Sequence, residues 1–218
     1  MRDLIILGTG VHGSEMAEIV ERVNAVKKTW RLVGFIAAAR GEARGEKCGL
    51  KILGAADAIA DYPQAQFVPD NEWPREIPVP MESLVSLADP SAFVSRTAAI
   101  GRGCVIYPHC YVGYNAKIGD YVFCLDGCVV NHDCVIEDRV VMASAVTLAG
   151  YVHVEADSYM GQSSTVRQYL RIGKGSLVGM GAVVVKDVAP KSVMAGNPAK
   201  WLKDRVAPAQ ETPSRQID

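Results

Sequence analysis

An apolar residue recurs at every sixth position of this chain from residue 94 to residue 184, without a miss. A period of six fits neither the 3.6 residues of a helical turn nor the alternation of a plain strand, but it suits short strands separated by corners. Hexapeptide repeats of this kind are typical of a parallel β-helix, which we predict over residues 86–203. The sixteen positions are Val94, Ile100, Ile106, Val112, Ile118, Cys124, Val130, Ile136, Met142, Leu148, Val154, Met160, Val166, Ile172, Val178 and Val184.

The repeat also predicts which residues become neighbours. Three hexads close one coil of 18 residues, and stacked coils lie about 4.8 Å apart, the usual spacing of paired strands. Residues 18 positions apart are therefore expected to stack. Five of the six cysteines take inward positions, so we interpret them as reduced core residues rather than as a disulfide framework.

Residues 1–85 have a different pattern. A buried strand "DLIIL", a glycine turn "GTGVHG", an amphipathic helix over residues 14–28 and a second strand over 31–37 predict a small α/β unit. Five of the eleven prolines fall between residues 63 and 80, which indicates an extended linker. Residues 204–218 are expected to form a polar tail.

The turn at residues 8–13 satisfies the G-x-G-x-x-G pattern, in which backbone amides at a helix N-terminus approach a phosphate. The dinucleotide version also needs an Asp or Glu about 20 residues further on, to hold the ribose. Ala37, Ala38 and Ala39 stand there instead. The sequence therefore disfavours a bound NAD.

Charge and hydropathy exclude several classes of partner. The chain has 23 Lys and Arg against 24 Asp and Glu, which favours a small-molecule substrate over nucleic acid or an anionic membrane. The first residues lack the apolar core of a signal peptide, and no 18 apolar residues run together. We therefore expect a cytoplasmic protein.

The repeat, followed by "VVVKDVAPKSVMAGNPAKWL", resembles the hexapeptide-repeat acyltransferases. With the glycine turn, the whole chain resembles the bacterial sugar acyltransferases that join a small Rossmann-like domain to a β-helix: the nucleotide-linked amino-sugar N-acetyltransferases of the bacillosamine and perosamine pathways, and the sialic acid O-acetyltransferases. This resemblance implies a left-handed β-helix, a short C-terminal helix or tail, acetyl-CoA as acyl donor, and a homotrimer with active sites between subunits.

The motif "NHD" provides the candidate catalytic pair. Acyl transfer needs a group that takes a proton from the attacking amine or hydroxyl, and imidazole suits this task because its pKa lies near neutrality. We interpret His132 as the general base and Asp133 as the acid that orients it. Gly150 stands one predicted coil after His132, so its N–H is the candidate donor to the oxyanion. The resemblance implies the same three residues.

The resemblance also implies the cofactor and substrate contacts. Acetyl-CoA is expected along the later coils, where the family's contacts correspond to Val141, Gly161, Gln162, Gly179 and Met180. Relatives commonly carry a histidine at the position of Val141. The family's "G-x-x-G-H-G" turn binds the nucleotide sugar, so Gly10, Val11 and His12 inherit that role.

The expected reaction is transfer of an acetyl group to a sugar, most directly to the amine of a nucleotide-linked amino sugar. Two alternatives stay open: O-acetylation of a sugar without a nucleotide, and a non-catalytic trimeric scaffold. No metal is expected. A zinc site would need three converging imidazoles, and His109, His132 and His153 do not stack, although a trimer brings together histidines of two chains.

Overall fold

The computed structural model describes residues 1–74 and 76–205. Its N-terminal part is a five-stranded sheet in the order β3-β4-β2-β1-β5, in which β1, β2, β4 and β5 run parallel and β3 runs antiparallel to β4. The elements are β1 (Arg2–Leu7), α1 (Val11–Val26), β2 (Trp30–Ala37), β3 (Glu46–Lys47), β4 (Leu50–Ala55), β5 (Gln66–Pro69) and the 3₁₀ turns Arg40–Glu42, Ala56–Asp61 and Met81–Ser83.

The predicted strand, turn, helix and second strand are all present, but strands β3, β4 and β5 were not predicted. Helix α1 begins at Val11, three residues before the expected start, because Gly10 is extended and serves as its N-cap. Residues 66–69, inside the expected linker, form β5 and pair with β1. Pro69 is compatible with this strand because β5 is an edge strand of the sheet, where proline is tolerated.

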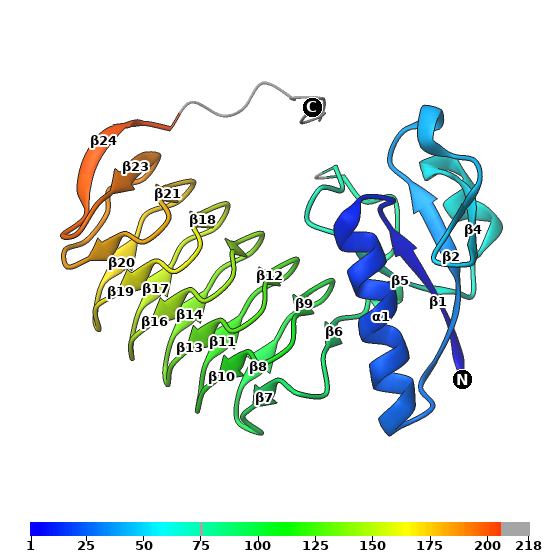
Figure 1. The fold of residues 1–218 in the computed structure, drawn as a ribbon, viewed down its shortest axis with the longest axis horizontal. Coiled ribbons are helices and arrows are strands. Elements are labelled where there is room, and N and C mark those ends of the chain that lie inside the picture. Colours follow the sequence, from blue (N-terminus) through cyan, green and yellow to red (C-terminus); the bar gives the residue numbers. More distant parts are fainter. Residues whose placement is uncertain (75, 206–218) are drawn as a thin grey trace.

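Residues 87–184 form a parallel β-helix with three faces (Figure 1). Face one holds β7 (Phe93–Val94), β10 (Tyr111–Val112), β13 (Val129–Val130), β16 (Thr147–Leu148), β19 (Thr165–Val166) and β22 (Val183–Val184). Face two holds β8 (Ala99–Ile100), β11 (Lys117–Ile118), β14 (Val135–Ile136), β17 (His153–Val154) and β20 (Arg171–Ile172). Face three holds β6 (Leu87–Ala88), β9 (Val105–Ile106), β12 (Phe123–Cys124), β15 (Val141–Met142), β18 (Tyr159–Met160), β21 (Leu177–Val178), β23 (Ser192–Ala195) and β24 (Lys200–Asp204).

The strand register confirms the predicted length of a coil. Val130 pairs with Val112 on one side and with Leu148 on the other, so each coil adds the three hexads that the repeat predicts. Fourteen of the sixteen repeat positions are buried, and Val94 and Ile100 in the first coil are partly buried. The repeat therefore fills the interior of the β-helix with one apolar side chain per strand.

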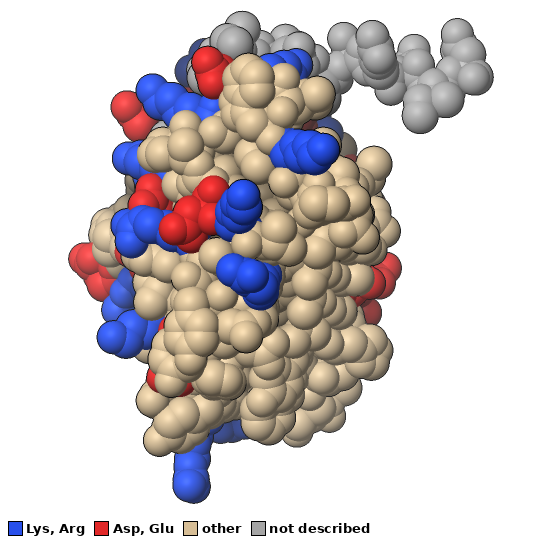
Figure 2. Space-filling view, turned by 90° about the vertical axis from the view of Figure 1, so that its left-hand side faces the viewer, with Lys and Arg blue, Asp and Glu red and all other residues tan. Residues whose placement is uncertain are grey.

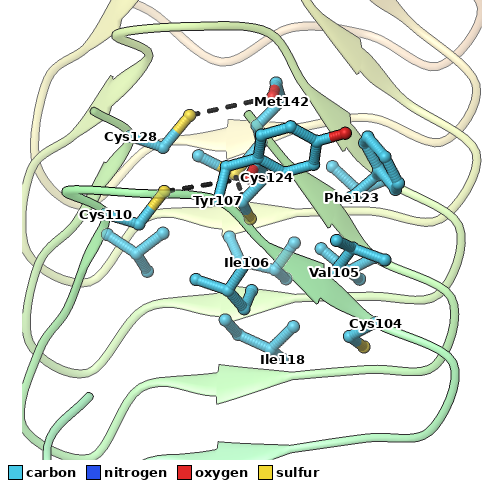
Figure 3. Close-up of a cluster of buried hydrophobic side chains, with 14 of the residues drawn as sticks. Cys104, Val105, Ile106, Tyr107, Cys110, Ile118, Phe123, Cys124, Cys128 and Met142 are labelled. Atoms are coloured by element: carbon cyan, nitrogen blue, oxygen red, sulfur yellow. Dashed lines mark hydrogen bonds between the residues drawn. The ribbon is translucent and has the colours of Figure 1, made fainter. Parts of the chain in front are cut away.

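The interior also holds the cysteines, as predicted. Cys104, Cys110, Cys124, Cys128 and Cys134 are buried thiols, and Cys48 is exposed. In Figure 3, Cys110 and Cys128 stack above one another beside Ile106 and Met142. Their Sγ atoms donate to backbone carbonyls of the chain, at 3.1 Å from Leu125 and from Ala143. Each thiol is thus a small core side chain that also donates a weak hydrogen bond to a backbone carbonyl.

Helix α1 joins the two parts. It packs between the N-terminal sheet and the first coil, and a single apolar core runs from Leu4 and Met16 to Leu87 and Phe123 (Figure 1). Arg22 also donates two hydrogen bonds to the buried Asp89, at 2.5 and 3.0 Å. Burial acts to raise the pKa of Asp89, but the hydrogen bonds from Arg22 and Ser91 lower it to about 2. The N-terminal part is therefore anchored to the β-helix by apolar contacts and a paired charge.

The end of the chain differs from the expected short helix or tail. Residues Lys200–Asp204 form β24, which pairs antiparallel with β23. This strand supplies hydrogen-bond partners for the last open edge of face three, which a helix does not. The rest of the expected polar tail, residues 206–218, lies outside the described residues. None of the described helices has the length and hydropathy needed to span a bilayer.

The repeat makes a prediction about stability. Leu148 is fully buried, whereas Thr147 on the same strand faces outward and is partly exposed. We expect Leu148→Ala to lower the free energy of unfolding by about 2–5 kcal/mol, because it leaves a cavity in a packed interior. Thr147→Ala is expected to cost less than about 1 kcal/mol. Urea unfolding measures both, and equal losses would contradict the assignment of inward and outward positions.

Candidate active site

His132 and Asp133 stand at the corner between β13 of face one and β14 of face two, which we call the one–two corner. The Nδ1 of His132 lies 2.9 Å from the Asp133 carboxylate. The hydrogen bond from His132 holds the pKa of Asp133 below its usual value. An ionised carboxylate only accepts, so Nδ1 carries the proton and Nε2 is left with a free lone pair. Within residues 1–74 and 76–205, Nε2 has no hydrogen-bond partner.

The backbone conformation at the corner positions His132 and Asp133. Asp133 has φ of 57°, in the left-handed region, and such residues recur at the corners of the β-helix. Asp and Asn tolerate this conformation better than other non-glycine residues. The Asp133 N–H donates to the Tyr114 carbonyl of the preceding coil at 2.8 Å. The pair is therefore fixed by the corner and left accessible, since the His132 side chain is 54% exposed.

Gly150 stacks directly under the imidazole, as the repeat predicts. A Cβ at this position would lie 2.6 Å from Cε1 and 2.7 Å from Nε2 of His132. Only glycine leaves room for the ring here. The Gly150 carbonyl accepts from the Tyr169 N–H, while the Gly150 N–H donates to no acceptor in the part of the chain that the structure describes. An unpaired N–H beside a candidate base is the arrangement that an oxyanion donor requires.

Two further residues of this corner were not predicted from the sequence. Asn115 donates to Asp133 at 3.4 Å. Tyr151 packs its ring edge-on to His132, with centroids 5.3 Å apart, and stacks on Tyr169. Asn115 and Tyr151 stand one coil before and one coil after Asp133. A step of 18 residues in either direction from Asp133, like the step from His132 to Gly150, leads to Asn115 and Tyr151.

The residues predicted to contact acetyl-CoA lie away from the one–two corner. Gly161, Gln162, Gly179 and Met180 follow β18 and β21, at the corner between faces three and one, which we call the three–one corner. The N–H groups of Gly161 and Gly179 donate to the next coil at 2.7 Å. Those of Gln162 and Met180 donate to no described residue, and Met180 is 78% exposed.

Val141 lies on face three, so the candidate residues of one chain occupy three separate places. Face one separates the one–two corner from the three–one corner. A single copy of the chain therefore does not bring His132 together with Gln162 and Met180.

The candidate substrate residues of the glycine turn have mixed surroundings. Val11 is 71% exposed. His12 instead faces the β-helix: its Nδ1 lies 3.1 Å from Glu15, and its ring meets Phe123 edge-on at 5.3 Å. The Tyr107 hydroxyl donates to the same Glu15 carboxylate at 3.0 Å. In this structure His12 takes part in the junction between the two parts of the chain.

Two carboxylates from the loop after β5 cover the glycine turn. Asp70 lies against Gly8, where an added Cβ would overlap its carboxylate, and Glu72 lies 3.0 Å from the position of a Cβ on Gly10. Asp70 is buried, and this burial raises its pKa to about 6, against hydrogen bonds from the N–H groups of Glu72 and Trp73. The end of α1 that attracts anions thus already carries negative charge.

Two cavities adjoin this loop. One, of about 800 Å³, lies over the glycine turn and includes Gly8, Gly10 and Ala39 in its lining. The other, of about 220 Å³, lies between the loop and face three and includes Val141. Asp70 and Trp73 line both. The loop expected to be a linker therefore forms the wall between the two cavities.

No metal cluster is found in residues 1–74 and 76–205, where no three His, Cys, Asp or Glu side chains are placed to share an ion. His153 lies 2.7 Å from Glu137 and 3.1 Å from Arg171 on face two. It is held by these charged neighbours rather than directed toward His132.

The chain matches no protein-family model. Among curated proteins, the acyl-[acyl-carrier-protein]–UDP-N-acetylglucosamine O-acyltransferase of Nautilia profundicola is 34% identical over 88 residues, which make up 40% of this chain and 34% of that protein. The chain therefore spans about a third of the length of this relative.

Among solved structures, the acetyltransferase domain of PglB from Neisseria gonorrhoeae FA1090, in complex with acetyl coenzyme A, aligns with a TM-score of 0.81 and 27% identity over 92% of this chain and 99% of that one. In sequence and in fold the chain is thus similar to hexapeptide-type acyltransferases. Its β-helix is left-handed, as the resemblance implies.

A further likeness concerns the fold alone. A variant of GDP-perosamine N-acetyltransferase from Caulobacter crescentus, in complex with CoA and GDP-perosamine, aligns with a TM-score of 0.80 and 24% identity over 94% of this chain and 98% of that one. The N-terminal part and the β-helix together therefore match the whole of a solved member of this fold.

The contact between Gly150 and His132 gives a structural prediction. We expect Gly150→Ala to fold and to displace the imidazole, because the new methyl group occupies its place. A crystal structure of the variant measures the distance between His132 Nδ1 and the Asp133 carboxylate. Gly41→Ala is the matched control, since no atom lies within 4 Å of a Cβ at that position. An unmoved imidazole in Gly150→Ala would contradict the packing.

The buried carboxyl of Asp70 predicts a pH dependence of stability. Its pKa is about 6 in the folded chain and near 3.8 in the unfolded chain, so folding penalises the ionised form. Stability is lost as the pH rises from near 3.8 through about 6. We expect Asp70→Asn to gain stability relative to the native chain between pH 4 and pH 7, by up to about 3 kcal/mol. Urea unfolding at both pH values tests this, and a pH-independent difference would contradict it.

Proposed function

We propose that this chain transfers an acetyl group from acetyl-CoA to an amino or hydroxyl group of a sugar. The observation that carries the proposal is the one–two corner, where a free Nε2 of His132 stands above a free N–H of Gly150. The structural neighbour bound to acetyl coenzyme A supports the identity of the donor.

In this mechanism His132 acts as the general base. Its Nε2 takes the proton from the nucleophile as the nucleophile attacks the thioester carbonyl. Asp133 keeps the proton on Nδ1 and stabilises the imidazolium that forms. The Gly150 N–H donates to the oxyanion of the tetrahedral intermediate. Collapse of this intermediate releases CoA as the thiol, after His132 returns the proton.

The donor occupies the space between two copies of the chain in this proposal. Gln162 and Met180 offer free N–H groups to the pantetheine, beside Gly161 and Gly179, and Val141 provides an apolar contact near the thioester. Because these residues lie apart from His132 within one chain, a complete site needs a neighbouring copy. We therefore propose a homotrimer with active sites between subunits.

Face one is suited to such contacts. It lies between the two corners, and its outward residues are uncharged: Phe93, Tyr111, Val129, Thr147, Thr165 and Val183. Phe93 and Tyr111 stack 5.1 Å apart and are exposed. Figure 2, seen from the left-hand side of Figure 1, shows a broad uncharged area beside a flank that carries both basic and acidic residues. Uncharged, partly apolar faces of this kind are typical of subunit interfaces.

The two parts of the chain have separate roles in this proposal. Residues 1–85 act as a Rossmann-like unit that holds the acceptor, with Gly10, Val11 and His12 at its glycine turn, and residues 86–203 carry out the transfer. The amine of a nucleotide-linked amino sugar is the first candidate acceptor, because the perosamine enzyme with the same fold is bound to GDP-perosamine.

A second acceptor class is favoured by a specific observation. Asp70 and Glu72 lie on the glycine turn, and Ala37, Ala38 and Ala39 replace the acid that holds a nucleotide. Negative charge at this position disfavours a diphosphate. An O- or N-acetyltransferase acting on a sugar without a nucleotide fits these residues.

An acetyl-CoA consumption assay with nucleotide-linked and free amino sugars tests the function. We expect His132→Ala to lower kcat by about 10²–10⁴-fold, the usual contribution of a general base. His153→Ala is the matched control, because this histidine lies on face two and is paired with Glu137. Full activity of a folded His132→Ala would exclude His132 as the base. Absence of acetyl-CoA binding would indicate a non-catalytic scaffold instead.

A further inference from the structure

The smaller cavity, of about 220 Å³, is built from both parts of the chain. One wall is the loop after β5, with Asp70 and Trp73, and the other is face three of the β-helix, with Phe123, Val141 and Tyr159. It is smaller than the roughly 300–1,000 Å³ of pockets for drug-sized ligands. It therefore has room for a single ring rather than for a whole nucleotide sugar.

The lining combines aromatic side chains with several polar and charged groups. Trp73, Tyr121, Phe123 and Tyr159 provide the aromatic surface. Arg139 and Asp157, whose side chains lie 2.9 Å apart, provide a charged pair at the same cavity. Aromatic surface beside several hydrogen-bonding groups suits a small polar molecule with a ring.

Two polar groups of the loop are buried at this cavity. Asp70 is 94% buried, since only 6% of it is exposed, and Trp73 is 92% buried. The Nε1 of Trp73 has no hydrogen-bond partner among the described residues. An unsatisfied buried donor costs free energy. A ligand oxygen that takes this hydrogen bond removes the cost.

We propose that this cavity is the subsite for the sugar ring of the acceptor, with the Trp73 N–H donating to a ring or hydroxyl oxygen and the Asp70 carboxylate accepting from a neighbouring hydroxyl or amine. This inference rests on the proposed function and names the residues that select the acceptor. Asp70 and Trp73 are binding residues in it, and the transfer itself stays with His132.

The position of the cavity agrees with this assignment. Val141, the candidate contact of acetyl-CoA, lines it, so the proposed sugar subsite adjoins the proposed donor site. Asp70 and Trp73 also line the cavity of about 800 Å³ over the glycine turn. Any group attached to the sugar thus has adjoining space on the other side of these two residues.

Trp73→Phe tests the proposal, because it keeps an aromatic ring and removes the N–H. Isothermal titration with a panel of free and nucleotide-linked amino sugars, in the presence of CoA, first identifies the sugar that binds. We expect Trp73→Phe to raise its Kd about tenfold, the effect of one hydrogen bond, and to leave the Kd of CoA unchanged. We expect no loss of thermal stability, because the variant removes an unpaired donor.

Trp30→Phe is the matched control, since Trp30 is 7% exposed and lines neither cavity. Asp70→Asn is a second, independent variant, also expected to raise the Kd of the sugar about tenfold or more. The proposal is overturned if no sugar of the panel binds, or if both variants bind it with native affinity. A sugar that binds, weakens in both variants and is never acetylated contradicts the proposed function while supporting this subsite.

Discussion

The stacking of one coil on the next is the constraint on which the rest of this structure depends. Each short strand of the β-helix is unstable alone, because its N–H and C=O groups are satisfied only by the strands one coil before and one coil after it. The inward residue of every strand adds apolar burial to these bonds. A register shift in one coil would therefore displace every corner that follows.

This constraint turns a distance along the sequence into a distance in space. His132 and Gly150, which no local motif connects, come into contact because they are one coil apart. Asn115, Asp133 and Tyr151 meet for the same reason. The side chains that carry the proposed chemistry all stand at corners, where left-handed residues turn the chain and point side chains away from the packed interior. The same scaffold that stabilises the fold thus places the candidate base beside Asp133 and Gly150.

The N-terminal part is stabilised by different interactions. Its sheet is held by longer strands and by helix α1, which shares one apolar core with the first coil and pairs Arg22 with Asp89. Helix α1 holds the N-terminal sheet close to the first coil, and the loop after β5 lies beside face three. Asp70 and Trp73 thereby become the wall between two cavities, and negative charge collects on a glycine turn whose pattern by itself predicts a phosphate site.

The sequence alone determined the β-helix, its register, the inward cysteines and the pairing of His132 with Asp133 and Gly150, because all of these follow from a strict period of six and from neighbouring positions. It also determined the first strand, helix and second strand of the N-terminal part. Only the tertiary structure decided that residues 66–69 form a sheet strand, that residues 200–204 form β24, and that His12 faces Phe123. These depend on contacts between segments with no common period, where a proline-rich stretch or a lone histidine carries no local signal of its partner.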